Sequence, residues 1–272
     1  MKNPRSILIT GASSGIGAAL ARCYAGPGVF FALCGRNRSR LNAVAEECRR
    51  LGAEVQAAVI DVTDRESLRA WIEEVDDRHP LDLVIANAGV SMGTARSLDE
   101  EELERELFDI NVTGVLNTIH PIIPRMRARR SGQIALMSAL GGFRGMPTAP
   151  AYTGGKAAVK VYGEGLRGSL KKDGIRVSVI CPGFVKSRIT ERIKAKMPFI
   201  LETDKAARII RQGLARNKAR IAFPWQTYWI YATFQILPPA WVDALFSLLL
   251  RTAWKEGWRP EPSSTPDAEH RG

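Results

Sequence analysis

The stretch "SILITGASSGIG", residues 6–17, decides the fold that we expect for this chain. It opens with a short apolar run of the kind that forms a buried strand, and glycines follow at positions 11, 15 and 17. Without side chains, Gly11, Gly15 and Gly17 let the backbone turn sharply and approach a pyrophosphate at the amino end of a following helix. The stretch predicts a strand–loop–helix unit that binds a dinucleotide. A tight turn without a ligand is the alternative that this spacing leaves open.

Similar apolar runs recur along the chain and alternate with charged segments of helical period, such as "RLNAVAEECRRLG" at residues 40–52. The runs are short and almost wholly apolar, as strands buried on both faces are. The predicted strands are residues 6–10, 29–34, 55–60, 81–86, 133–138, 175–181 and 220–223. Their alternation with helices predicts an α/β fold, a Rossmann-type doubly wound parallel sheet with helices on both faces.

Changes in composition suggest three parts. We expect the Rossmann-type catalytic domain to cover residues 1–220. Residues 221–258 form an apolar, aromatic-rich extension, which we expect to pack as helices on the domain, on a membrane or on a partner. Residues 259–272 are rich in proline, serine and charge, and we predict that they are disordered.

The composition excludes several classes of protein. The chain has 272 residues, of which 45% are hydrophobic and 25% charged, so it can bury a large core. Its four cysteines are scattered without a Cys-x-x-Cys pair, so we expect neither a disulfide framework nor a metal site. The first residues contain no apolar signal-peptide core. We therefore expect a cytoplasmic protein.

The formal net charge of +11 suits nucleic acid, an anionic membrane surface or acidic small molecules as partners. The densest basic run, "RMRARR" at residues 125–130, precedes Ser-Gly at the expected end of a helix. Cations at that position complement the helix dipole. Because the other basic residues are spread along the chain, we expect no nucleic-acid partner.

The glycine loop and five short motifs after it identify a family. They follow in the order "TGASSGIG" (10–17), "DV" (61–62), "NAG" (87–89), Asn111, "YTGGK" (152–156) and "PG" (182–183). In this order the chain resembles the classical short-chain dehydrogenase/reductase family over residues 6–187. The resemblance implies an oxidoreductase that uses a nicotinamide dinucleotide to interconvert a carbonyl and a secondary alcohol.

The resemblance also implies which residues contact the cofactor. Those in the glycine loop are Gly11, Ser13, Ser14, Gly15, Ile16 and Gly17. Those bordering the adenine are Asp61 and Val62, and those lining the cleft are Asn87, Ala88 and Gly89. Near the nicotinamide the resemblance places Pro182, Gly183 and Val185.

The residue after the second predicted strand bears on the choice of cofactor. An acidic residue there would accept hydrogen bonds from the ribose hydroxyls of NAD, but this chain has Gly35 and Arg36. A guanidinium offers a planar fork of donors to a 2′-phosphate, and the local sequence shows no carboxylate opposing it. We therefore expect NADP(H) to be favoured over NAD(H), although Ser14 stands where many NADP-preferring relatives carry a second basic residue. An ordinary surface arginine is the alternative.

Tyr152 and Lys156 are four residues apart, so a helix places both on one face. A free tyrosine has a pKa near ~10, and a nearby ammonium lowers that pKa toward neutrality. By resemblance, Tyr152 is the acid/base, while Lys156 lowers its pKa and holds the nicotinamide ribose. Asn111 is implied to support a water that relays protons to Lys156.

The family usually carries a serine thirteen residues before the tyrosine, and this chain has Ala139 there, with Ser138 one residue earlier. Ser138 is the candidate substitute, but its hydroxyl should face away unless the strand end shifts by one residue. Losing one donor at a developing oxyanion commonly costs about 10²–10³ in rate.

Gly154 and Gly155, between Tyr152 and Lys156, either loosen that helical turn or admit a bulky neighbour. The alternative function is a catalytically weak or silent nucleotide-binding scaffold.

The last third of the chain bears on substrate and partners. Residues 191–204, "ERIKAKMPFILETD", fall where the family has its variable substrate lid. Their basic residues and the apolar "MPFIL" suggest a small apolar substrate, with or without an anionic end; an ordinary surface helix is the alternative. The family resemblance implies a homo-oligomer, a dimer or tetramer.

The aromatic stretch 221–250 is uncharged from Ile221 to Val242, and prolines at 224, 238 and 239 argue against one continuous span. It predicts two short helices that form a membrane-surface contact, an oligomer interface or a flap over the pocket. The membrane reading would place the protein at the periphery of the membrane's inner face.

Overall fold

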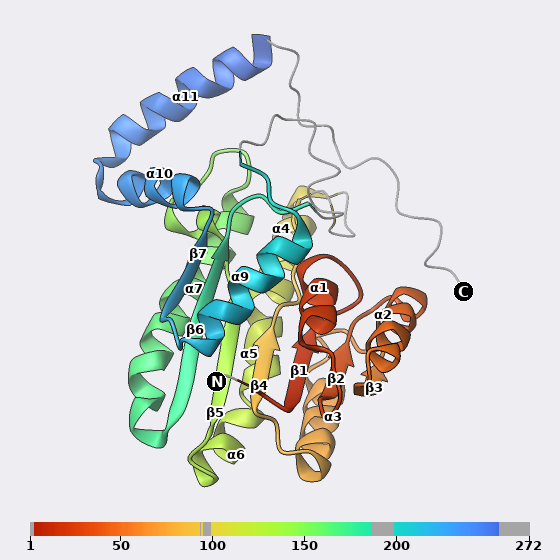
Figure 1. Cartoon of the computed structure of the whole chain (residues 1–272). Helices are drawn as coiled ribbons and strands as arrows, with labels where there is room; N and C mark the ends of the chain where they lie inside the picture. Colours follow the sequence, from red (N-terminus) through yellow and green to blue (C-terminus); the bar gives the residue numbers. More distant parts are fainter. Residues whose placement is uncertain (1–2, 93, 95–98, 187–198, 256–272) are drawn as a thin grey trace.

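Seven parallel strands form the centre of the part that the computed structural model describes, residues 3–92, 94, 99–186 and 199–255 (Figure 1). They are β1 Ser6–Thr10, β2 Phe30–Cys34, β3 Glu54–Ala58, β4 Leu83–Ala86, β5 Gly132–Met137, β6 Ile175–Pro182 and β7 Arg220–Phe223. Their order in the sheet is β3-β2-β1-β4-β5-β6-β7. The predicted doubly wound parallel sheet is confirmed, with its topological switch between β1 and β4.

The register of the strands brings their carboxyl ends to one edge of the sheet. Thr10 at the end of β1 pairs with Cys34 at the end of β2. Pro182 at the end of β6 pairs with Phe223 at the end of β7. The predicted site residues follow these ends, so the topology gathers them along that edge.

Helices cover both faces of the sheet. They are α1 Gly15–Tyr24, α2 Arg38–Arg50, α3 Arg65–Arg78, α4 Glu100–Phe108, α5 Gly114–Ile119, α6 Ile122–Ala128, α7 Pro150–Leu170 and α9 Thr203–Ala215. Three short helical turns, η1 Asp109–Thr113, η2 Leu140–Phe143 and η3 Lys171–Asp173, join them.

Alternation along the strands divides the core between these two helical layers. Ile7 and Ile9 pack with residues of α1, α2 and α9, whereas Leu8 between them packs with residues of α3 to α7. All three side chains are fully buried. Strands buried on both faces explain why they read as continuous apolar runs.

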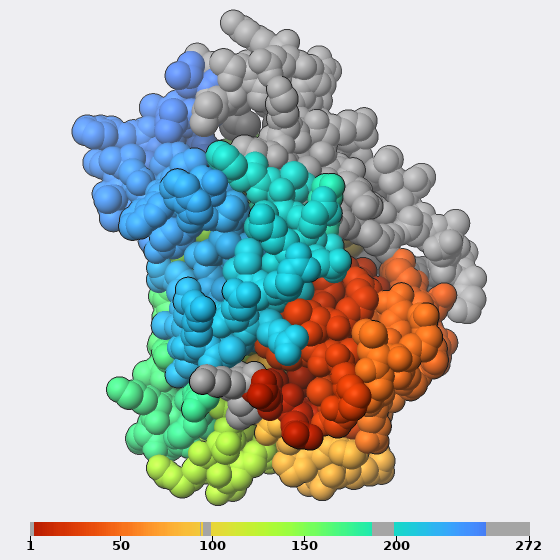
Figure 2. Space-filling model, viewed as in Figure 1, coloured from red at the N-terminus to blue at the C-terminus, as the bar shows by residue number. Residues whose placement is uncertain are grey.

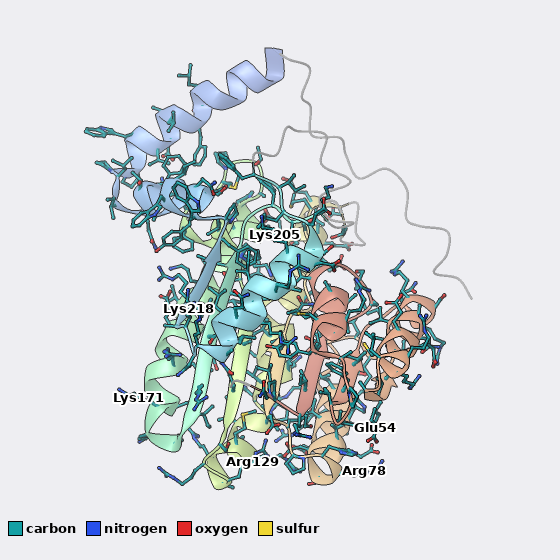
Figure 3. All side chains as sticks on the ribbon, in the orientation of Figure 1. Glu54, Arg78, Arg129, Lys171, Lys205 and Lys218 are labelled. Carbon is teal, nitrogen blue, oxygen red and sulfur yellow. The ribbon has the colours of Figure 1, made fainter. Side chains whose placement is uncertain are left out.

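The arginine run at residues 125–130 lies at the carboxyl end of α6, as predicted. Arg125 Nη1 lies 2.6 Å from Asp77 Oδ1, and Arg129 Nη1 lies 2.8 Å from the buried carboxylate of Asp76. The run thus ties α6 to α3. Elsewhere, the basic side chains labelled in Figure 3 stand on separate elements.

The aromatic stretch forms two helices, α10 Trp225–Ile236 and α11 Pro239–Lys255, which are separated at the predicted proline pair. Figures 1 and 2 show both at the top of the molecule, with α11 projecting from the body. Arg144 Nη2 lies 3.0 Å from Asp243 Oδ1 and links α11 to the segment after η2. No helix in the described part of the chain is long and apolar enough to cross a membrane.

Two predictions concern segments outside the described residues. Most of the expected substrate lid at residues 191–204 falls in the range 187–198, and the expected disordered tail is residues 259–272.

Candidate active site

The glycine loop packs tightly against the segment that follows β4. Gly11 has a φ of +66°, and a Cβ there would lie 2.7 Å from Cα of Ala88. A Cβ on Gly17 would lie 2.6 Å from Nδ2 of Asn87. Both positions therefore require glycine. The packing of the loop against Asn87 and Ala88 demands the same absence of side chains that a bound pyrophosphate would need.

Asn87 fixes the loop through hydrogen bonds. Its Nδ2 donates to the carbonyl oxygens of Thr10 and Gly11, at 2.9 and 3.2 Å. The hydroxyl oxygen of Thr10 accepts from the backbone N–H groups of Asn87 and Ala88, at 3.1 and 3.2 Å. The sequence analysis did not predict this role for the Thr10 hydroxyl. The only indication in the sequence is that Thr10 directly precedes the first glycine of the loop.

The amino end of α1 fits a dinucleotide. Ser14 is the N-cap residue in extended conformation and makes no side-chain cap hydrogen bond. Ser13, Ser14, Gly15 and Ile16 are partly exposed, as a binding surface must be. A Cβ on Gly35 would approach Oγ of Ser13 to 3.2 Å, so this second glycine brings the end of β2 against the loop. A loop built in this way accepts phosphate on free backbone N–H groups.

Two carboxylates flank Arg36, contrary to the expectation that none opposes it. Nη1 of Arg36 lies 3.6 Å from Oδ2 of Asp61 and 4.0 Å from Oε1 of Glu106. Asp61 also accepts a hydrogen bond of 2.9 Å from the Thr63 hydroxyl. The expectation was wrong because Asp61 follows β3 and Glu106 lies in α4, so only the tertiary fold brings them to Arg36.

Val62, beside Asp61, lies in the core rather than on the surface. It is 5% exposed, and a Cβ on Gly114 would clash with its Cγ2 at 2.5 Å. Its carbonyl oxygen accepts from Nδ2 of Asn117 at 2.9 Å. Val62 therefore also anchors the segment after β3 to α5.

Asn111 and Lys156 converge on Gly89. A Cβ at Gly89 would lie 2.7 Å from Oδ1 of Asn111 and 3.2 Å from Nζ of Lys156. The fully buried Asn111 side chain accepts from Val90 N at 3.1 Å and donates to Val90 O at 2.9 Å. Asn111 lies in η1, a π-helical turn, and such turns often occur at functional sites. The structure thus brings together three residues that are far apart in sequence.

Tyr152 and Lys156 share one face of α7, as their spacing predicts. Nζ of Lys156 donates to the carbonyl oxygen of Met137 at 3.1 Å and lies 5.8 Å from the centre of the Tyr152 ring. Neither Gly154 nor Gly155 interrupts α7, and a Cβ at either would make only ordinary contacts of 3.5 Å. The helix holds the pair without needing either glycine.

The pKa of Tyr152 runs against the sequence-based expectation that the neighbouring ammonium lowers it. Burial raises the pKa of Tyr152 to about 12, and the neighbouring Tyr231 adds to that rise. Burial lowers the pKa of Lys156 to about 8, partly offset by Cys181. The argument from charge omitted desolvation, which disfavours both charged forms when the two groups are buried together.

Ser138 is engaged with α7. Its hydroxyl donates to the carbonyl oxygen of Lys156 at 2.7 Å, and the side chain is 2% exposed. Ala139, at the position where the family usually has serine, is 7% exposed. In this structure the Ser138 hydroxyl therefore secures β5 to α7.

The segment after β6 lies beside these residues. Gly183 N donates to Phe223 O at 2.7 Å, and a Cβ there would lie 3.1 Å from Cδ of Pro224. Pro182 ends β6, and Val185 pairs with Leu201 in an isolated bridge and is buried against the α1–α9 layer. The sheet register places this segment at the same carboxyl edge as the glycine loop.

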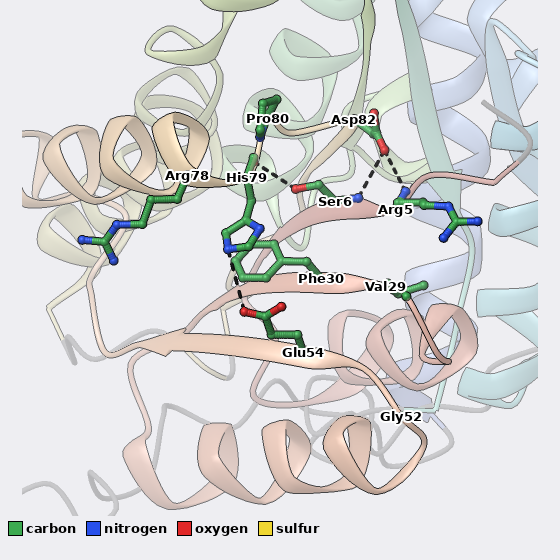
Figure 4. Close-up of a pocket in the computed structure, with 11 residues that line it drawn as sticks. Arg5, Ser6, Val29, Phe30, Gly52, Glu54, Arg78, His79, Pro80 and Asp82 are labelled. Atoms are coloured by element: carbon green, nitrogen blue, oxygen red, sulfur yellow. Dashed lines mark hydrogen bonds and ion pairs between the residues drawn. The ribbon is translucent and has the colours of Figure 1, made fainter.

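A separate pocket of about 440 Å³ opens at the opposite, amino edge of the sheet (Figure 4). Its polar groups bind one another: Asp82 Oδ2 accepts from the backbone N–H groups of Arg5 and Ser6, and the His79 ring stacks on Phe30. Ligands of doubly wound sheets bind at the carboxyl edge, so we do not assign this pocket to the cofactor.

Known proteins resemble this chain in sequence over most of its length. The short chain dehydrogenase family model matches residues 5–198. An uncharacterized oxidoreductase of Myxococcus xanthus is 37% identical over 241 residues, which cover 88% of this chain and 95% of that protein.

Two solved structures are similar over most of their length. A short chain dehydrogenase from Mycobacterium paratuberculosis, bound to NAD, is 25% identical with a TM-score of 0.70, covering 82% of this chain and 96% of that one. A short-chain dehydrogenase from Sphingobium yanoikuyae, in complex with NADPH, is 24% identical with a TM-score of 0.71, covering 97% and 99%. Structures with this fold therefore hold either dinucleotide.

Proposed function

Since the chain belongs to the short chain dehydrogenase family and is an oxidoreductase, we propose that it is an NADP(H)-dependent enzyme that reduces a ketone on an apolar substrate. The observation that carries this proposal is the convergence of Asn111 and Lys156 at Gly89, with Tyr152 on the same face of α7. This cluster lies at the carboxyl edge of the sheet, which also carries the glycine loop.

The cofactor would be held by groups already aligned for it. The glycine loop and the amino end of α1 would bind the pyrophosphate, and Lys156 would hold the nicotinamide ribose. When bound, the reduced dinucleotide supplies a hydride to a carbonyl carbon.

Tyr152 would supply the proton. With a pKa of about 12, its phenol is protonated at neutral pH and can donate to the carbonyl oxygen. Lys156, with a pKa of about 8, can hold or release a proton near physiological pH and so can restore the phenol. The raised pKa of Tyr152 and the lowered pKa of Lys156 favour reduction of a ketone over oxidation of an alcohol, because oxidation requires the Tyr152 phenolate.

The preference for NADP(H) rests on Arg36. A 2′-phosphate carries nearly two negative charges and is recognised bidentately by a guanidinium. Such a group can compete with Asp61 and Glu106, which lie 3.6 and 4.0 Å from Nη1. The carboxylates would then orient the guanidinium.

The apolar character of the substrate is supported by the cover that α10 forms. Tyr231 packs against a cluster that includes Leu140 and Phe143 of η2, next to α7. A pocket with such walls favours a substrate with little charge around its carbonyl group.

The exposed side of α10 and α11 supports membrane contact. Trp225, Trp229 and Trp241 are 69%, 62% and 67% exposed, and Ile236 is 82% exposed. Tryptophan favours the headgroup region of a bilayer, and the chain's positive charge suits anionic lipid. We propose that these helices lie on an anionic membrane surface, from which an apolar substrate would enter.

Exposed apolar side chains on α4 and α7 support a homo-oligomer. Phe108 on α4 and Val161 and Tyr162 on α7 are 44%, 61% and 36% exposed. These apolar side chains lie on two helices that pack together and suit contact with a second copy.

A second candidate function is a catalytically silent nucleotide-binding protein. It is favoured by Ala139, since the Ser138 hydroxyl is engaged with the Lys156 carbonyl. Titration with NADPH and NADH, followed by a panel of apolar ketones, separates the two functions. Binding without turnover on every ketone would favour the silent protein.

A further inference from the structure

We propose that Tyr231 of α10 lies in the substrate pocket beside Tyr152 and donates the second hydrogen bond to the substrate carbonyl, in place of the serine that Ala139 lacks. This inference rests on the proposed ketone reduction. It assigns a role in positioning substrate to a residue outside the span of the family model, residues 5–198.

The site otherwise has one hydroxyl donor too few. Ala139 offers a methyl group, and the nearby Ser138 hydroxyl donates to the Lys156 carbonyl at 2.7 Å. A donor aimed at the developing oxyanion commonly contributes about 10²–10³ in rate. A replacement donor should therefore come from another element at the same edge.

Tyr231 is such a donor. Its partly buried ring packs against the cluster of Leu140, Phe143, Val179 and Cys181, so the side chain contacts the body of the protein. Its hydroxyl donates to Sδ of Met146 at 3.4 Å. A thioether is a weak acceptor, so a carbonyl oxygen would be a better partner for this hydroxyl.

Met146 and Tyr152 meet at Gly141. A Cβ placed on Gly141 would lie 4.0 Å from Sδ of Met146 and 4.0 Å from Cε1 of Tyr152. The Tyr231 hydroxyl, which contacts the same sulfur, therefore lies in the same neighbourhood as Tyr152. The two phenols also interact electrostatically, since Tyr231 contributes to the raised pKa of Tyr152.

The two phenols would have different tasks. The carbonyl carbon gains the hydride, and its oxygen gains the proton of Tyr152, which gives the alcohol. Tyr231 would keep its proton and donate a hydrogen bond to that oxygen, because burial raises its pKa as well.

The test compares Tyr231→Phe with Tyr228→Phe. Tyr228 is on the same helix, but its hydroxyl interacts with Arg220 and its ring packs edge-on against Phe143. The probes are acetophenone, cyclohexanone and 2-decanone with NADPH. We expect Tyr231→Phe to lower kcat at least tenfold, with little change in KM, and Tyr228→Phe to leave kcat within about twofold. Adding Ala139→Ser to Tyr231→Phe should restore part of the loss.

A second readout does not depend on turnover. The chain has five tyrosines, so ¹³Cζ-tyrosine NMR can follow each phenol during a pH titration. Tyr231→Phe should lower the pKa of Tyr152, and Tyr228→Phe should not. An unchanged Tyr152 pKa, or a Tyr231→Phe variant as active as Tyr228→Phe while Tyr152→Phe is inactive, would overturn this inference alone. Ketone reduction that survives Tyr152→Phe would instead contradict the proposed function.

Discussion

Nζ of Lys156 lies 5.8 Å from the centre of the Tyr152 ring, and the buried amine donates a hydrogen bond to the carbonyl oxygen of Met137 at the end of β5. Burial moves their pKa values toward the neutral forms, to about 12 for the phenol and about 8 for the amine. Burying the charged Lys156 amine therefore lowers the free energy of unfolding at neutral pH. This destabilisation can be measured.

Replacing Lys156 by methionine should stabilise the protein at pH 7 and abolish turnover. The unfolded lysine keeps its proton up to its ordinary pKa of 10.5, whereas the folded one loses it near pH 8. Between these two pH values the unfolded state binds more protons than the folded state. The contribution of Lys156 to the free energy of unfolding of the wild type therefore rises with pH. Urea unfolding should show Lys156→Met more stable by about 1–3 kcal/mol at pH 7, with a smaller difference at pH 9.5. Equal differences at both pH values would contradict the assignment.

Removing the Arg36 guanidinium should weaken NADPH binding selectively. Charge-assisted hydrogen bonds to phosphate are worth about 1.5–3 kcal/mol, so Arg36→Ala should raise the Kd for NADPH about 10- to 100-fold. The Kd for NADH should stay within about twofold. The exposed neighbour Arg38 provides the control variant, Arg38→Ala. Equal weakening of NADH and NADPH by Arg36→Ala would show that Arg36 does not read the 2′-phosphate.

Replacing two glycines of α7, Gly154 and Gly163, by alanine should change the stability of the protein in opposite directions. Gly154 is exposed, and a Cβ there meets only Phe108 Cζ at 3.5 Å, so Gly154→Ala should stabilise by about 0.5–1 kcal/mol. A Cβ on Gly163 would lie 2.6 Å from Val179 Cγ2 and 2.7 Å from Leu136 Cδ1. Gly163→Ala should therefore destabilise by about 1–3 kcal/mol. Urea denaturation measures both, and a destabilising Gly154→Ala would mean that the turn between Tyr152 and Lys156 needs glycine.

Sedimentation with vesicles should reveal the membrane contact. The wild type should bind phosphatidylserine–phosphatidylcholine vesicles, and the triple change of Trp225, Trp229 and Trp241 to glutamine should reduce binding at least tenfold, because each exposed tryptophan contributes to interfacial affinity. The control variant is Leu51→Gln, because Leu51 is an exposed apolar residue at the carboxyl end of α2, outside α10 and α11. Wild-type protein that stays in the supernatant would contradict the proposal.

The fold was predictable because the switch from apolar runs to helical period is a local property of the chain. All seven predicted strands coincide with observed strands within about two residues, and the aromatic stretch divides at Pro238 and Pro239. The proximity of Tyr152 and Lys156 was likewise fixed by helical spacing.

What could not be predicted depends on segments that meet only in the folded chain. Glu106 of α4 reaches Arg36, and Tyr231 of α10 reaches Met146, over long separations in sequence. The rise in the pKa of Tyr152 was predicted in the wrong direction, and the fall in the pKa of Lys156 was not predicted, because burial depends on packing from several elements. Local spacing contains no measure of that desolvation.

The most direct test of the central claim follows NADPH oxidation at 340 nm with the ketone panel, in wild type and Tyr152→Phe. If Tyr152 is the proton donor, the wild type will reduce at least one ketone, and Tyr152→Phe will lose more than about 10²-fold in kcat while its Kd for NADPH stays within about twofold. A Tyr152→Phe variant that binds NADPH and turns over like the wild type would contradict the claim.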